Sequence, residues 1–145
     1  MSSATMLRDL IASRTAVAPP VGSNSFVPAE VLQNAGRLTR ADVDACDFGV
    51  VKIDDTATIL LFNLYEGELA SLTPSQAEGK KFFTQIGPCA NNGLFFGAFK
   101  RGVAANNLNV TFPYTFTYRM KPTNVLIHLY RDNASKTNWI FVKKA

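Results

Sequence analysis

Apolar and polar side chains alternate along residues 109–120 of this 145-residue chain. Most intervening positions are polar, and every second position is apolar or aromatic: Val110, Phe112, Tyr114, Phe116, Tyr118 and Met120. A period of two over this length predicts a half-buried antiparallel strand. Two further strands are predicted after it, at 124–132 and 138–144. Two more are predicted before it, at 48–54 and 57–63, where the short turn between them favours a hairpin.

The helical signals fall mainly between these two groups of strands. Residues 93–105 predict the longest helix, because one face would carry Phe95, Phe96, Phe99 and Val103. Thr73 followed by Pro74 is typical of a helix start, and residues 28–39 carry helix formers interrupted at Gly36. This order of elements predicts an α+β fold, in which helices pack on one antiparallel sheet of about five strands.

Composition then narrows the classes of function. Hydrophobic residues make up 47% of the chain and charged residues 18%, which is typical of a globular protein. The net charge of +4 comes from scattered basic pairs and not from a basic run, so we do not expect nucleic-acid binding. The apolar runs are too short for a membrane span, and the chain begins without the apolar segment of a signal peptide. We therefore expect a cytoplasmic protein with no membrane contact.

The residues that usually bind metals or catalyse reactions are scarce. Cys46 and Cys89 lack metal-ligand spacing, and the single histidine makes a zinc site still less favourable. A disulfide between the two cysteines is not expected in a reducing cytoplasm. His128 is opposite in parity to its apolar neighbours Ile127 and Leu129, which predicts a solvent-facing side chain. With no nucleophile–base pair and no phosphate-binding loop, we do not expect an enzyme.

Two residues remain as candidates for chemistry, and each has an ordinary alternative. Glu66 follows a strand end in FNLYEGEL. If it turns inward, burial raises its pKa and lets it donate a hydrogen bond or a proton; otherwise it is a surface carboxylate at a helix start. Cys89 lies in IGPCANN. It is either an inert buried thiol or a reactive one, activated by amide N–H groups or by the helix predicted to start near Gly93.

Several longer segments, in sequence order, resemble the photoactive yellow protein family of small blue-light receptors with the PAS fold: FGVV, FNLYEGEL, EGKKFFTQIGPC, FFGAFKRGVAANNLNVTFPYTFTYRMKPT and NWIFVKK. The resemblance runs from Phe48 to the C-terminus and extends more faintly back to Pro28. It implies a PAS domain at 48–145 and an N-terminal cap at 28–47. Residues 1–27, which include the Pro/Gly/Ser-rich stretch AVAPPVGSNSF, are predicted to form a flexible arm.

The resemblance also implies a chromophore and its site. In that family para-coumaric acid (4-hydroxycinnamic acid) is held as a thioester on a cysteine that matches Cys89, and a buried glutamate that matches Glu66 hydrogen-bonds the phenolate. Asn63 matches the residue that ties the pocket to the cap. The pocket lining matches Phe62, Ala70, Leu72, Phe82, Tyr114, Phe116, Tyr118 and Met120. The implied signal begins with trans–cis isomerisation in light and proton transfer from Glu66. The carboxylate stranded in a low-dielectric site then loosens the cap.

Three positions depart from the family pattern. Phe62 replaces a tyrosine that donates a second hydrogen bond to the phenolate, Ala70 replaces the threonine that supports this tyrosine, and Leu72 replaces an arginine that shields the pocket. We expect a raised phenolate pKa, a mixture of phenol and phenolate, and a red-shifted phenolate band. The alternative is a light-independent PAS module for protein interaction or ligand binding, with an empty or repurposed pocket. The sequence leaves open the downstream protein and whether the chain forms a homodimer.

Overall fold

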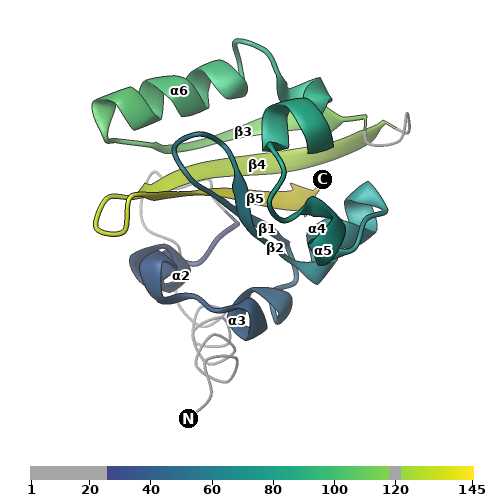
Figure 1. The fold of residues 1–145 in the computed structure, drawn as a ribbon, viewed down its shortest axis with the longest axis horizontal. Coiled ribbons are helices and arrows are strands. Elements are labelled where there is room, and N and C mark those ends of the chain that lie inside the picture. The colour runs from purple at the N-terminus through teal and green to yellow at the C-terminus, as the bar shows by residue number, and fades with distance from the viewer. Residues whose placement is uncertain (1–25, 118–121) are drawn as a thin grey trace.

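The computed structural model describes residues 26–117 and 122–145, and in these residues a five-stranded sheet forms the centre of the fold. The strand order across the sheet is β2-β1-β5-β4-β3, and every neighbouring pair is antiparallel (Figure 1). The predicted α+β class and strand count are confirmed. The strands are β1 (Gly49–Ile53), β2 (Ile59–Phe62), β3 (Asn109–Phe116), β4 (Thr123–Asp132) and β5 (Thr137–Lys144).

The helical segments lie before β1 and between β2 and β3. No helix in the described residues is both long enough and apolar enough to cross a membrane. Turns of 3-10 or π type, labelled η, separate some of the α-helices. The segments are α2 (Ala29–Gln33), η1 (Ala35–Arg37), α3 (Arg40–Asp44), α4 (Leu64–Ala70), α5 (Pro74–Ala77), η2 (Phe82–Ile86), η3 (Pro88–Ala90) and α6 (Phe96–Ala105).

Two apolar cores lie on opposite faces of the sheet. Ile140 and Val142 of β5 belong to the first core, which also contains side chains from α4, α5 and α6. Trp139 and Phe141 belong to the second core, with side chains from α2 and α3. Successive strand residues point to opposite faces, so these neighbours in β5 place one core on each face. In Figure 1 the sheet lies between α6 and the α2–α3 segment.

The residues before β1, which are predicted to form a cap, contain helices that differ from the prediction. The helix predicted at 28–39 is divided into α2 and η1 at Asn34. The helix α3 was not predicted, although a capping box marks its start: the Thr39 hydroxyl accepts from the Asp42 amide, and the Asp42 carboxylate accepts from the Thr39 amide. Phe26 and Val27, at the end of the predicted arm, pack in the second core. The rest of the predicted arm lies outside the described residues.

The alternating segment is confirmed as strand β3 up to Phe116, and its inward residues become more buried along the strand. Val110 is 42% exposed, whereas Phe116 is fully buried. Because β3 is an edge strand, only its later part is fully covered by the first core. Tyr118 and Met120 fall outside the described residues, so their predicted places in the pocket stay predictions.

The prediction of a solvent-facing His128 is wrong. Its side chain is 2% exposed, and its ring packs edge-on against Tyr130 and Phe141. Its Nε2 lies 2.6 Å from Asn109 Oδ1. Parity placed His128 correctly on the face opposite Ile127, but that face is covered as well, by the second core. The histidine is therefore part of a packed layer.

Burial of His128 predicts a loss of stability in mild acid. Burial lowers the pKa of His128 from 6.5 to about 4, so the unfolded chain takes up a proton at a higher pH than the folded chain does. The free energy of unfolding should fall by about 2–3 kcal/mol between pH 7 and pH 4 from this group. Urea unfolding of wild type and of His128→Gln across this range measures it. The variant should lose most of the slope, and an equal slope in both proteins would contradict the assignment.

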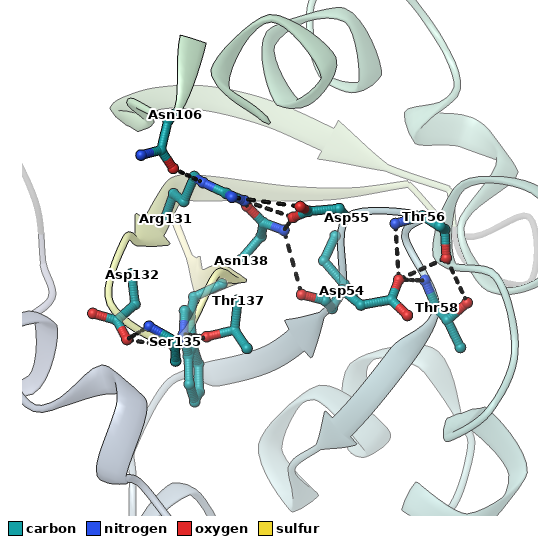
Figure 2. Close-up of polar contacts among 12 residues, drawn as sticks. Asp54, Asp55, Thr56, Thr58, Asn106, Arg131, Asp132, Ser135, Thr137 and Asn138 are labelled. Atoms are coloured by element: carbon teal, nitrogen blue, oxygen red, sulfur yellow. Dashed lines mark hydrogen bonds and ion pairs between the residues drawn. The ribbon is translucent and has the colours of Figure 1, made fainter. Parts of the chain in front are cut away.

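A buried arginine joins three segments at one end of the sheet (Figure 2). Arg131 of β4 donates to the Asp55 carboxylate at 2.6 Å, to Asn138 Oδ1 at 3.0 Å and to Asn106 Oδ1 at 2.7 Å. Asn138 Nδ2 in turn donates to Asp55 Oδ1 at 2.9 Å. The network holds the β1–β2 turn against β4, β5 and the end of α6. It supplies hydrogen-bond acceptors to the Arg131 guanidinium, which is almost wholly buried.

Removing the charge of Asp55 should weaken the fold in a pH-dependent way. We expect Asp55→Asn to lower the free energy of unfolding by about 1.5 kcal/mol at pH 7, a moderate value because the Asp55 side chain is 43% exposed. The hydrogen bond from Arg131 holds the pKa of Asp55 below its usual range. The Asp55 contribution is therefore present above about pH 4 and is lost as pH falls through the lowered folded pKa. Urea unfolding at pH 7 and pH 3 should show the difference shrinking, and a constant difference would count against the ion pair. Asp47→Asn, in an exposed pair with Lys143, is the control and should change little.

Candidate functional site

The predicted site residues that the structure describes gather around the first core. Some are buried members of that core, and others are half-buried and pack against it. The buried members are Phe62, Ala70, Phe82 and Phe116, and the half-buried ones are Leu72, Cys89 and Tyr114. They come from β2, α4, the loop after α4, η2, η3 and β3. The fold therefore brings together residues that are far apart in the sequence.

Cys89 lies in a short 3-10 turn that is fastened to β3. The turn η3 has Pro88 at its first position and follows the π turn η2. The Tyr114 hydroxyl donates to the Cys89 carbonyl oxygen at 2.7 Å, and Asn92 Nδ2 donates to the same oxygen at 3.4 Å. The Cys89 side chain is half-buried and its thiol is free. Cys46 packs in the second core, so the structure keeps the two cysteines on different faces of the sheet.

The helix expected near Gly93 starts later than predicted, at Phe96. Asn92 occupies the approach to it: its side-chain Oδ1 accepts from the Phe95 amide at 2.9 Å and its carbonyl accepts from the Gly97 amide at 3.0 Å. These amides are therefore engaged by Asn92. Asn92 was not recognised from the sequence, although an Asx residue just before a helix is a common capping signal.

Glu66 is fully buried in the first turn of α4. A Cβ atom at Gly49 would lie only 2.5 Å from Glu66 Oε1 and 3.2 Å from Val142 Cβ. The carboxyl group therefore lies against strand β1, next to a side chain of the first core, and it needs glycine at position 49 to fit. Of the two alternatives for Glu66, the inward one is confirmed. Gly49 was not recognised as part of the site, because a glycine in a strand gives no sign of which side chain will approach it.

Asn63 connects Glu66 with the cap, as predicted. Its Oδ1 accepts from the Glu66 amide at 3.1 Å and from the Val50 amide at 2.9 Å. Its Nδ2 donates to the carbonyl oxygens of Val43, in α3, and Phe48, just before β1. The side chain is fully buried, so a movement at the start of α4 must either carry Asn63 with it or break these bonds.

The three positions that depart from the family pattern present an apolar surface. Phe62 and Ala70 are buried and Leu72 is half-buried. The turn that places Leu72 is tight: its amide donates to the Gly67 carbonyl at 2.9 Å, and a Cβ atom at Gly67 would lie 2.5 Å from the Leu72 carbonyl oxygen. Position 72 is thus held by backbone contacts and needs no charged side chain to stay near the core.

Aromatic rings from η2, β3 and the residue before α6 contact one another in the first core. Phe95 is central, with its ring centroid 6.0 Å from Phe82, 5.2 Å from Tyr114 and 6.0 Å from Phe116. Such edge-on and tilted contacts suit the binding of another flat ring. Among the described residues no group of acidic, histidine and cysteine side chains is arranged to hold a metal ion.

Curated proteins that are similar to this chain share one name, photoactive yellow protein. No protein-family model matches the chain. The photoactive yellow protein of Rhodothalassium salexigens is 43% identical over 104 residues, which cover 72% of this chain and 83% of that protein. The photoactive yellow protein of Halochromatium salexigens is 33% identical over 119 residues, which cover 82% of this chain and 95% of that protein.

Solved structures extend the comparison to three dimensions. The photoactive yellow protein domain of a sensor histidine kinase from Rhodospirillum centenum superposes with a TM-score of 0.71 at 30% identity, covering 79% of this chain and 98% of that domain. The PAS domain of an HTR-like protein from Haloarcula marismortui superposes with a TM-score of 0.58 at 14% identity, covering 78% of this chain and 98% of that domain. At that identity the second likeness concerns the fold alone.

Proposed function

The chain belongs to the photoactive yellow protein family of PAS-fold blue-light receptors, and we propose that it senses blue light with para-coumaric acid bound as a thioester on Cys89. Attachment would join Cys89 Sγ to the carbonyl carbon of an activated acid. The activating group leaves with the bonding electron pair, and the thiol proton leaves with it or passes to solvent. The observation that carries the proposal is that the half-buried Cys89 thiol packs against the first core, and the buried carboxyl of Glu66 lies next to Val142 of the same core.

The described residues suit a hydroxycinnamoyl group. Such a group needs a sulfur at one end, flat apolar walls along its length and a polar partner for its hydroxyl oxygen. Cys89 supplies the sulfur, and Phe82, Phe95 and Phe116 supply rings in the first core. Glu66 supplies a buried carboxyl against Val142 of the same core. When bound, the group would supply absorption of visible light and a double bond that light isomerises.

The chain's own residues then account for a signal. In the dark Glu66 holds a proton on its carboxyl group and would donate a hydrogen bond to the hydroxyl oxygen of the bound hydroxycinnamoyl group. Release of that proton leaves a carboxylate in a buried site, which costs several kcal/mol unless the site opens. Asn63 supports a route for this opening, because it contacts the Glu66 amide on one side and the carbonyls of Val43 and Phe48 on the other. The proposed output is therefore a loosened N-terminal cap.

Reconstitution tests the proposed attachment. Purified protein is incubated with para-coumaric acid activated as an anhydride, and then examined by absorption and by mass spectrometry of the intact and digested chain. We expect a visible band and one added acyl group, located on the peptide that contains Cys89. Protein that gains no acyl group, or gains it on lysines without a visible band, would overturn the proposal.

The second candidate is a PAS module that no longer senses light. Phe62, Ala70 and Leu72 favour it, because together they remove a hydroxyl donor, its support and a charged shield. In that case the pocket would bind an apolar ligand, or none, and the output would be a protein contact. The same reconstitution distinguishes the two candidates, since this one predicts no visible band.

A further inference from the structure

Besides Asn63, the Glu78 carboxylate connects the cap to the end of β2, next to the site. Glu78 follows α5 directly. Its Oε1 accepts from the Arg40 guanidinium at 2.6 Å, and its Oε2 accepts from the Phe62 amide at 3.1 Å. Arg40 is the first residue of α3 in the cap, and Phe62 is the last residue of β2. One side chain thus connects α3 with the end of β2, and the adjacent Asn63 also bonds to α3 through the Val43 carbonyl.

The Phe62 amide needs such a partner. β2 is an edge strand, and Phe62 lies opposite Val51 of β1. The next amide, of Asn63, already donates to the Val50 carbonyl. Since amides alternate in direction along an antiparallel strand, the Phe62 amide points away from β1. Glu78 therefore fills a position where the sheet offers no acceptor.

The cap also holds the segment from Phe62 to Leu64, where β2 leads into α4, at a second point. Asp44, the last residue of α3, accepts from the Leu64 amide at 2.9 Å through its carboxylate. One end of α3 thus reaches Phe62 through Glu78, and the other end bonds Leu64 directly, so α3 is linked to both neighbours of Asn63. The segment from Phe62 to Leu64 leads directly to Glu66 in the first turn of α4. The contacts that hold α3 against this segment therefore also hold the start of α4.

We infer that Glu78 is a positioning residue whose bond to Arg40 sets how readily the cap separates from the site. Exposed ion pairs usually contribute little, but the Glu78 side chain is only 20% exposed and its second oxygen is fixed by a backbone amide. Arg40 is 49% exposed, so dissolved salt weakens the pair. The role of Glu78 in the light response rests on the proposed function, whereas its hold on the cap does not.

Trp139 provides a direct measure of that hold. It is the only tryptophan of the chain, is fully buried and belongs to the second core, which also contains the cap residues Val31 and Val43. Quenching of its fluorescence by acrylamide therefore reports separation of the cap. The measurement uses the full chain in the dark, before and after treatment with activated para-coumaric acid. If reconstitution fails, the quenching measured before treatment still tests the hold of Glu78 on the cap. If the quenching result contradicts that hold, the proposed attachment at Cys89 is not affected.

The test compares Arg40→Gln and Glu78→Ala with wild type at low and high salt. We expect the quenching constant to rise about two- to fivefold in both variants at low salt. Wild type should approach the variants at high salt, and Arg40→Lys should restore much of the protection. The matched control Asp47→Asn, in the exposed 3.5 Å pair with Lys143, should behave as wild type. The inference is overturned if Arg40→Gln quenches like wild type. It is also overturned if its effect is the same at every salt concentration, or if the control changes as much.

Discussion

Replacing Cys89 with alanine should abolish both the visible band and the covalent mass increase after treatment with activated para-coumaric acid. The expected loss is complete, because a thioester needs a sulfur and the only other cysteine lies in a different core. The carbonyl of residue 89 would still accept from Tyr114, so the loop should keep its fold. Intact-mass spectrometry and absorption of the treated variant measure the outcome.

Cys46→Ala is the matched control for this variant. Burial raises the pKa of the Cys46 thiol to about 12, so almost none of it is the reactive thiolate near neutral pH. We expect Cys46→Ala to acquire the same band and mass as wild type. An acyl group on Cys89→Ala, or its loss from a folded Cys46→Ala, would show that attachment does not take place at Cys89.

Replacing Phe62 with tyrosine should convert a mixed spectrum into a single phenolate band. The new hydroxyl supplies the donor that the family pattern has at this position. One hydrogen bond to a charged group is worth about 1.5–3 kcal/mol, so the pKa of the bound phenol should fall by about one to two units. The phenolate band should also move toward the blue, because charge becomes more localised on the oxygen. Absorption spectra from pH 6 to pH 9 measure both effects.

Position 70 offers the control for this variant. Ala70→Thr alone adds a hydroxyl but no donor to the phenolate, and should leave the spectrum close to wild type. The double variant Phe62→Tyr with Ala70→Thr should show the lowest phenol pKa, because the threonine supports the tyrosine. A wild-type spectrum with one band unchanged from pH 6 to pH 9 would contradict the expected effect of Phe62, as would an unchanged spectrum in Phe62→Tyr.

Much of the fold could be predicted from local patterns. The strands are marked by alternation or by β-branched and aromatic runs, and Thr73-Pro74 marks the start of α5. The errors came from tertiary contacts. His128 appeared solvent-facing because parity tells which face a residue occupies, but not whether that face is covered. The short α3 was missed because its apolar residues are too few to show a period, although Thr39 and Asp42 form its capping box.

For the site, the sequence indicated the residues that would carry the chemistry but not the residues that hold them in place. Resemblance to a family indicated Cys89 and Glu66, and the structure placed both around the first core. The residues that hold them in place were not predicted. Gly49, Asn92 and Glu78 act through close approach or through hydrogen bonds to backbone atoms, and such contacts depend on distances that no sequence period encodes.

The response of the reconstituted wild-type chain to light tests the central claim most directly. Absorption is recorded in the dark, after a blue flash, and during the following dark period. A light sensor that uses Cys89 and Glu66 should lose its visible band on illumination and regain it in the dark. A covalently loaded protein whose band does not change with light would contradict the account.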